Sequence, residues 1–274
     1  LGHLRRLQGV DAPVINGADL TELALEGAYL PRAKLGGTDM SGLNLSHANM
    51  TGAVLARSNL RNAIMYRANL SESDMDGANL EGANMSNATL INTTLKRTMM
   101  EDVNLSNADL TGADLNNSIL SSATLTDANL TGANLSNCDM TGVNLTGANL
   151  TGTIFREANL TDADMNNVIM SGADLTGANL TGVSLEGSVY LLGVDLHGAS
   201  MSGAYLVRAD MMGANLSGAN LSSAFIDNAD LTDATLIGTN LTFAEMSGAY
   251  LTRANLTGAN LTSADLNGAN LFDA

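Results

Sequence analysis

Three histidines and one cysteine are the residues whose side chains could most readily serve as a base, a nucleophile or a metal ligand. They are His3, His47, His197 and Cys138. A nucleophilic serine needs a base within hydrogen-bond reach, and a metal site needs several ligands around one point. The four residues are far apart along the chain. They can therefore do this chemistry only if the fold brings them together.

The sequence repeats a pattern of five residues along most of its length. An apolar residue stands at every fifth position from Ile15 to Tyr190 and again from Leu196 to Leu271, which gives 36 and 16 positions, 52 in all. Most units carry a small residue, usually Ala, two positions before this central residue and Asn or Asp immediately before it. Ser or Thr often follows the central residue, and Gly often comes next. The spacing between Tyr190 and Leu196 is six, so the sequence predicts one inserted residue near 191–194, with Tyr190 in a central position.

A period of five fits neither an amphipathic helix, with 3.6 residues per turn, nor a flat strand, with a period of two. It indicates a chain that makes one short extended side and one corner in each unit. The central residue and the small residue are then expected to point inward. The Asn or Asp, the Ser or Thr and the Gly are expected outside or at corners, where Gly tolerates a tight backbone. The period alone allows a coil of three, four or five sides.

The unit Ala-(Asp/Asn)-Leu-X-X, as in the run Ala173-Asp174-Leu175-Thr176-Gly177, resembles the pentapeptide repeat family. The resemblance extends over residues 13–273. It implies an all-β fold: a right-handed, four-sided (quadrilateral) parallel β-helix, a solenoid of about 13 coils of four pentapeptides. Residues 13–274 are accordingly predicted to form a single β-helix. Residues 1–12 lie outside the repeat, and Leu1, Leu4 and Leu7 recur every third position, so we expect a cap segment that could be a short helix.

With four units per coil, His47 and His197 fall on different sides and seven coils apart. Cys138 occupies an inward small-residue position, where a thiol acts as an apolar filler. The sequence therefore predicts no catalytic residues, no metal ligands and no cofactor, and the protein is not expected to be an enzyme.

The chain carries 12 basic and 28 acidic residues, a net charge of −16. This balance argues against direct nucleic-acid binding and against adhesion to anionic membranes. No apolar run approaches the roughly 18 residues of a membrane span. A cytoplasmic location is favoured, although the sequence begins at Leu1 and could lack an N-terminal targeting region.

A perfectly regular repeat marks no site, so contact residues are sought where the repeat breaks. Around the insertion, the expected apolar bulge is either a local packing adjustment or a partner contact; it comprises Tyr190, Leu191, Leu192 and Val194. A second candidate is one side on which basic residues gather: Lys34, Arg57, Lys96, Arg97 and Arg156. An uncapped C-terminal coil would expose a strand edge, so we expect either an end-to-end homodimer there or a sequence that is a piece of a longer chain.

Two functions are compatible with these features. The first is a rigid scaffold or protein–protein interaction rod with an unidentified protein partner. The alternative, which the family resemblance suggests, is a DNA mimic that binds DNA gyrase, as in quinolone-resistance proteins. Mimicry requires a dense row of negative charges, whereas the carboxylates here are spread over all four sides with only a mild excess on one of them. The gyrase-binding members of the family also centre many units on Phe, whereas Phe155 is the only central Phe here. The scaffold is therefore the preferred hypothesis.

Overall fold

The computed structural model describes residues 14–187 and 189–274. The chain divides into two compact units, Leu1–Asp139 (unit 1) and Met140–Ala274 (unit 2), and each is described by itself. The cap expected at residues 1–12 lies outside the described residues. That residues 13–274 form one continuous β-helix stays a prediction.

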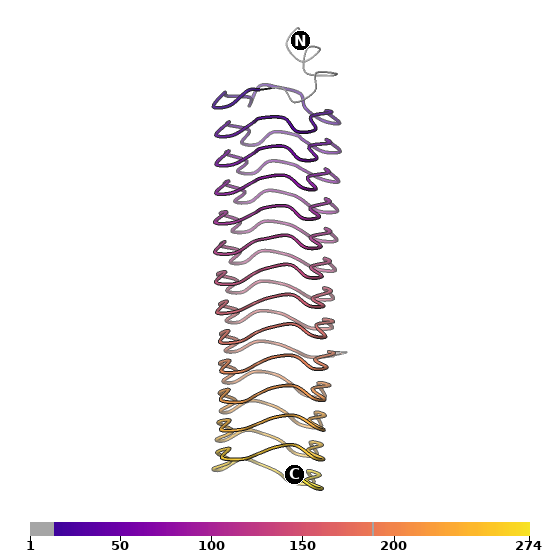
Figure 1. The fold of residues 1–274 in the computed structure, drawn as a ribbon, viewed down its shortest axis with the longest axis vertical. Coiled ribbons are helices and arrows are strands. Elements are labelled where there is room, and N and C mark those ends of the chain that lie inside the picture. The colour runs from indigo at the N-terminus through magenta and orange to yellow at the C-terminus, as the bar shows by residue number, and fades with distance from the viewer. Residues whose placement is uncertain (1–13, 188) are drawn as a thin grey trace. The chain divides into compact units, whose positions relative to one another are not determined.

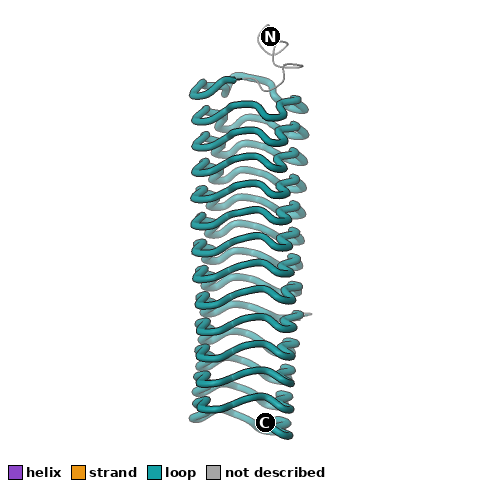
Figure 2. Tube along the Cα trace, in the orientation of Figure 1, coloured by secondary structure: helices purple, strands orange, loops and turns teal. Residues whose placement is uncertain are grey.

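Each of the two compact units is a stack of coils, and one turn of a coil takes 20 residues (Figure 1). Parallel bridges join residues 20 apart, and four bridge positions, five residues apart, occur in each coil. An example is the set Lys34↔Val54, Asp39↔Asn59, Asn44↔Ile64 and Asn49↔Asn69. The coils therefore have four sides, as predicted. Over residues 14–187 and 189–274 the structure contains no helix and no strand longer than one bridging residue (Figure 2).

Hydrogen bonds between successive coils follow a recurring backbone pattern, which Leu60 and its neighbours illustrate. The N–H of central Leu60 donates to the carbonyl of Asn79 on the next coil at 2.7 Å, and the N–H of Asn79 donates back to the carbonyl of Ser58 at 2.9 Å. Within the corner, the N–H of Ala63 donates to the carbonyl of Leu60 at 3.0 Å. Buried backbone groups thus have partners even though no long strand forms.

The corners explain why Asn or Asp precedes the central residue. The side-chain Oδ1 of Asn104 accepts hydrogen bonds from the backbone N–H and the hydroxyl of Ser106, at 3.0 and 2.7 Å. This local bond is an Asx-turn, which directs the chain around the corner. The next residue, Asn107, has φ of 58°, in the left-handed region where Asn and Gly are favoured. A five-residue unit with Asn or Asp at this position therefore specifies its own turn.

The interior is filled by the predicted inward positions. The central Leu and Met residues and the small residues two positions before them are buried in nearly all described coils, and Phe155 is the largest side chain among them. Most hydroxyls that take the small position find acceptors: Thr98 and Ser118 both donate to the carbonyl of Leu95, at 2.7 and 2.6 Å, whereas the buried Ser73 hydroxyl has no partner among the described residues. The core is consequently narrow, and it contains few polar groups.

The structure corrects the position of the insertion. Bridges keep an offset of 20 up to Asp164↔Ser184 and change to 21 at Ile169↔Tyr190. Leu191 is 1% exposed and Tyr190 is 51% exposed, so Leu191 is the central residue after Leu185. The prediction of a central Tyr190 with the insertion near 191–194 is wrong: the extra residue lies between Leu185 and Val189. Val189 and Leu191 fill the two inward positions at no polar penalty, whereas a buried Tyr190 hydroxyl would need a partner.

We expect replacement of a central residue to destabilise the fold according to its burial. Leu145 is fully buried and Leu271 is 43% exposed. Leu145→Asn should lower the free energy of unfolding by roughly 3 kcal/mol or more, because it loses apolar burial and introduces an amide with no partner. Leu271→Asn should cost about 1 kcal/mol or less. Urea unfolding followed by circular dichroism measures both.

Leu145→Met is the control, because it keeps the volume and Met is already common in central positions; it should cost less than about 1.5 kcal/mol. Equal losses for the two Asn variants would contradict the assignment of the core.

Cys138 gives a second test of the interior. Its Sγ donates to the carbonyl of Leu115 at 3.0 Å, and burial raises the pKa of the thiol to about 12. Since the thiolate is the reactive form, the native protein at pH 8 should react with a disulfide reagent at least about 100-fold more slowly than the urea-unfolded protein. Absorbance of the released thiol follows the rate, and Cys138→Ala supplies the blank. Equal rates would show that this side chain is not enclosed.

Candidate protein-binding surface

The residues that could have formed a catalytic or metal site do not do so in the described part of the chain. In unit 1 the His47 ring lies edge-on to Tyr66, with centroids 5.7 Å apart, and Arg67 lies over the Tyr66 ring at 5.0 Å. In unit 2 the backbone N–H of His197 donates to the Asp195 carboxylate at 3.1 Å. No group of three or more His, Cys, Asp or Glu side chains suited to a metal ion occurs among the described residues. His3 lies outside them.

The predicted basic side is largely neutralised by the protein's own carboxylates. Three of its five cations form ion pairs: Lys96–Asp114 at 2.8 Å, Arg97–Asp76, and Arg156–Asp174. The hydrogen bond from Lys96 to the Asp114 carboxylate raises the pKa of the ammonium group above its usual value. Lys34 and Arg57 form no ion pair with any described residue. Arg156 belongs to unit 2 and the other four to unit 1, so these cations do not make one continuous basic surface in either unit.

The apolar residues near the insertion separate into buried and exposed ones. Leu191 and Val194 occupy inward positions and are at most 1% exposed, so they cannot contact a partner. Tyr190 and Leu192 flank Leu191 and are 51% and 54% exposed. The predicted contact set therefore reduces to two residues.

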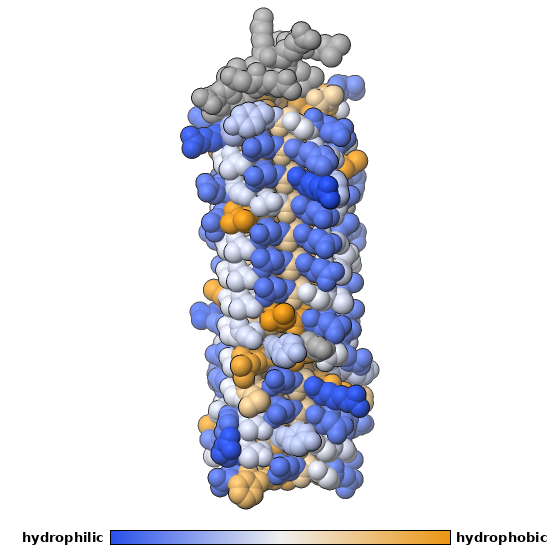
Figure 3. All heavy atoms as spheres, turned by 90° about the vertical axis from the view of Figure 1, so that its right-hand side faces the viewer, coloured by the Kyte–Doolittle hydropathy of each residue, from blue (hydrophilic) through white to orange (hydrophobic). Residues whose placement is uncertain are grey.

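Two further exposed side chains adjoin them. Ile169 is the bridge partner of Tyr190 on the preceding coil. Met212 lies at the same corner as Leu192 one coil on, since the N–H of Gly193 donates to the Met212 carbonyl at 3.2 Å. Ile169, Tyr190, Leu192 and Met212 together form what we call the unit 2 patch. Figure 3 shows one face of the molecule, on which scattered hydrophobic side chains interrupt columns of polar ones.

Sequence reasoning missed the patch for a specific reason. With Tyr190 assigned to the interior, no pattern in the sequence placed Ile169, Tyr190 and Met212 together. The patch could have been found by testing Leu191, in place of Tyr190, as the central residue. Once Leu191 is taken as central, Ile169 and Tyr190 fall in one column, 21 residues apart.

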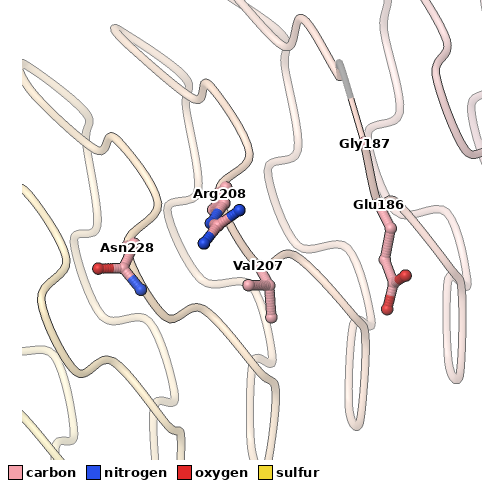
Figure 4. A pocket seen from close by; sticks show the side chains of 5 residues that line it. All are labelled: Glu186, Gly187, Val207, Arg208 and Asn228. Carbon is pink, nitrogen blue, oxygen red and sulfur yellow. The ribbon is translucent and has the colours of Figure 1, made fainter.

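A second apolar pair lies on the neighbouring side of unit 2. Tyr205 and Phe225 are bridge partners, and their rings stack with centroids 4.8 Å apart and planes within 8°. The corner between this side and the patch contains a hollow of about 480 Å³, lined by Glu186, Gly187, Val207, Arg208 and Asn228 (Figure 4). These residues come from three successive coils, and the Glu186 carboxylate points away from Arg208. The hollow begins where the extra residue is accommodated.

The surroundings of the patch are acidic. Residues 164–235 contain eight carboxylates and one cation, Arg208. Asp210 is the bridge partner of Tyr190, and Asp230 is the bridge partner of Asp210. Neither carboxylate forms an ion pair within the described part of unit 2. Among the described residues, none forms a helix long and apolar enough to cross a membrane.

Comparison with solved structures gives several repeat proteins of low identity. HetL from the cyanobacterium Nostoc sp. strain PCC 7120, a pentapeptide repeat protein involved in heterocyst differentiation regulation, is 27% identical over 98% of this chain and 95% of its own, with a TM-score of 0.29. Rfr23 from the cyanobacterium Cyanothece 51142 is 25% identical over 52% and 86%, with a TM-score of 0.28. QnrB1, a plasmid-mediated fluoroquinolone resistance protein, is 15% identical over 94% and 90%, with a TM-score of 0.22. At these TM-scores the likenesses support no inference about function.

No curated protein sequence matches the chain. The model of the family described as pentapeptide repeats matches it in eight overlapping copies, at residues 38–77, 73–117, 104–142, 118–156, 154–189, 190–228, 214–253 and 234–273. These copies cover most of the sequence and agree with the 20-residue coils and the five-residue corners described above. The chain belongs to the pentapeptide repeat family.

Proposed function

We propose that the protein is a non-enzymatic scaffold that binds a partner protein through the unit 2 patch. The observation that carries this proposal is the gathering of four exposed apolar side chains on neighbouring columns, next to the break in the repeat. Exposed apolar patches rimmed by polar residues are typical of protein–protein contact sites. The repetitive coils supply a firm support for such a patch, because each coil is hydrogen-bonded to its neighbours.

Two residues of the patch depart from the repeat at a cost in local hydrogen bonding. At the bridge position, Asn149 and Asp210 accept the N–H of the residue two positions later, at 3.1 and 3.2 Å. Ile169 and Tyr190 take the same position in this column and have no acceptor that could close this turn. Each substitution thus gives up a hydrogen bond that contributes about 1 kcal/mol. Cross-strand packing between two neighbouring apolar residues can recover part of that loss, and burial against a partner would recover more.

Mimicry of DNA at gyrase is less well supported. A duplex presents one negative charge per about 1.7 Å along its axis. Only two of six successive residues in the column through Tyr190 are acidic, in the order Asn149, Ile169, Tyr190, Asp210, Asp230 and Tyr250. Two features of the fold and assembly also stay predictions: a right-handed array of about 13 coils, and an end-to-end homodimer.

The mimicry alternative is tested with purified DNA gyrase. We expect no inhibition of supercoiling at protein concentrations up to about 10 μM, a range in which a specific binder would saturate its target. Gel electrophoresis of plasmid topoisomers gives the readout. Inhibition at submicromolar protein would reverse the order of the two proposed functions.

The scaffold proposal is tested by returning the patch to the repeat pattern. Tyr190→Asn with Leu192→Ser places ordinary repeat residues at both positions and should leave the fold intact. The wild-type protein is immobilised and incubated with a lysate of its source organism. It should retain at least one protein of which the double variant retains about tenfold less, the loss expected when a binding hot spot is removed. Quantitative mass spectrometry compares the two.

Tyr250→Asn with Ile237→Ser is the matched control. It makes the same kinds of substitution at similarly exposed residues of unit 2 outside the patch. Equal retention by the patch variant and by the wild type would contradict the proposal.

A further inference from the structure

We infer that the segment bound by the unit 2 patch is a protein segment with one or two bulky apolar side chains flanked by Lys or Arg. This inference rests on the proposed function and adds the chemistry of the partner. It is carried by the size of the patch, by the carboxylates that border it and by the way those carboxylates are held.

The size of the patch limits the apolar part of the partner. Ile169, Tyr190 and Met212 come from three successive coils, and Leu192 lies beside Tyr190 across the central Leu191. Coils spaced by about 4.8 Å make the patch roughly 10 Å tall. This height accommodates two neighbouring side chains of a helix turn or of an extended strand. Such an area favours a short linear segment over a broad domain surface.

The border of the patch selects the charge of that segment. Asp210 follows Tyr190 directly in its column, Asp230 comes next, and Asp195 lies on the neighbouring side of the corner that holds Leu192. Like charges opposite each other on adjacent strands destabilise a sheet. The Asp210 and Asp230 carboxylates are in this relation, and no described cation pairs with either of them. A Lys or Arg of the partner would relieve their repulsion.

The two carboxylates are already oriented for such a contact. Oδ1 of Asp210 accepts the N–H of Met212 at 3.2 Å, and Oδ1 of Asp230 accepts the N–H of Thr232 at 2.9 Å. The second oxygen of each makes no hydrogen bond to any described residue. Little side-chain entropy is therefore lost when a cation binds, which strengthens a charge-assisted bond relative to a mobile surface pair.

Other occupants fit the surface less well. A second copy joined through the same patch would bring two acidic borders together and add no cation to either, since a two-fold contact uses the same surface of both copies. Phosphate groups of nucleic acids or of anionic lipids would meet the same repulsion. A basic, apolar protein segment meets none of these objections.

The test uses three short synthetic peptides labelled with fluorescein. The first has Leu and Phe flanked by Lys, the second has Leu and Phe flanked by Glu, and the third has Ser in place of Leu and Phe with the Lys retained. Fluorescence anisotropy should show that the first peptide binds the wild-type chain about tenfold or more tightly than either of the others. Its affinity should fall about tenfold in Tyr190→Asn with Leu192→Ser and remain unchanged in the Tyr250→Asn with Ile237→Ser control. It should also weaken with added salt.

The outcomes separate this inference from the proposed function. Equal binding of the Lys-flanked and Glu-flanked peptides, or binding of the Ser-containing peptide as tight as that of the first, overturns the inference. If the lysate comparison still yields a patch-dependent partner, and its binding segment contains no excess of Lys and Arg, the scaffold proposal stands while the inference fails. Light scattering that shows self-association of the wild type, abolished by the patch variant, would assign the surface to a second copy and overturn the inference as well.

Asp210→Asn probes the charge directly and leaves an acceptor for the N–H of Met212. The affinity of this variant for the Lys-flanked peptide should be about threefold or more lower than that of the wild type, which is within the range for charge-assisted contacts. Its melting temperature should not decrease. An unchanged affinity would overturn the role of this carboxylate.

Discussion

The structure depends on the register between successive coils. A central N–H reaches the carbonyl of the bridge residue one coil on, and that residue's N–H returns to the carbonyl two positions before the central residue, as for Leu60, Asn79 and Ser58. This pairing repeats without adjustment when each coil contains the same number of residues, and the extra residue between Leu185 and Val189 is accommodated outside the bridge positions. Every unit must therefore both turn the chain and keep its length. The five-residue sequence pattern is the consequence of that constraint.

Two side-chain roles satisfy the constraint in each unit. Burial of the Leu or Met gives the coil its interior, and the Asn or Asp closes the corner through an Asx-turn, as Asn104 does for Ser106. The left-handed residue that follows is Gly at many corners, yet Asn107 and Arg67 also adopt it. Gly is therefore not required at each corner: the side-chain bond and the hydrogen bond to the next coil stabilise a conformation that other residues reach at modest expense.

Much of this was predictable from the sequence, and what was missed has a physical cause. The spacing predicted a coil and its inward positions, and the family resemblance predicted its four sides. It could not decide between Tyr190 and Leu191 as the central residue, because both are apolar enough to continue the pattern on either side of a six-residue gap. That choice depends on the burial of Val189 and on the need of the Tyr190 hydroxyl for water. Ion pairs such as Lys96–Asp114 were also beyond the sequence, since side-chain reach decides them and column membership does not.

A single extra residue changes the surface more than it changes the core. Leu185 and Leu191 keep their inward positions, and the bridges resume at Ile169↔Tyr190, so the interior of unit 2 continues through the break. The outward positions have no such requirement and can differ from the repeat without loss of packing. An array of hydrogen-bonded coils can thus present an irregular apolar surface on a regular support, and the partner does not have to order that support on binding. For this reason the departures from the repeat, and not the repeat itself, are where the specificity of such a protein can reside.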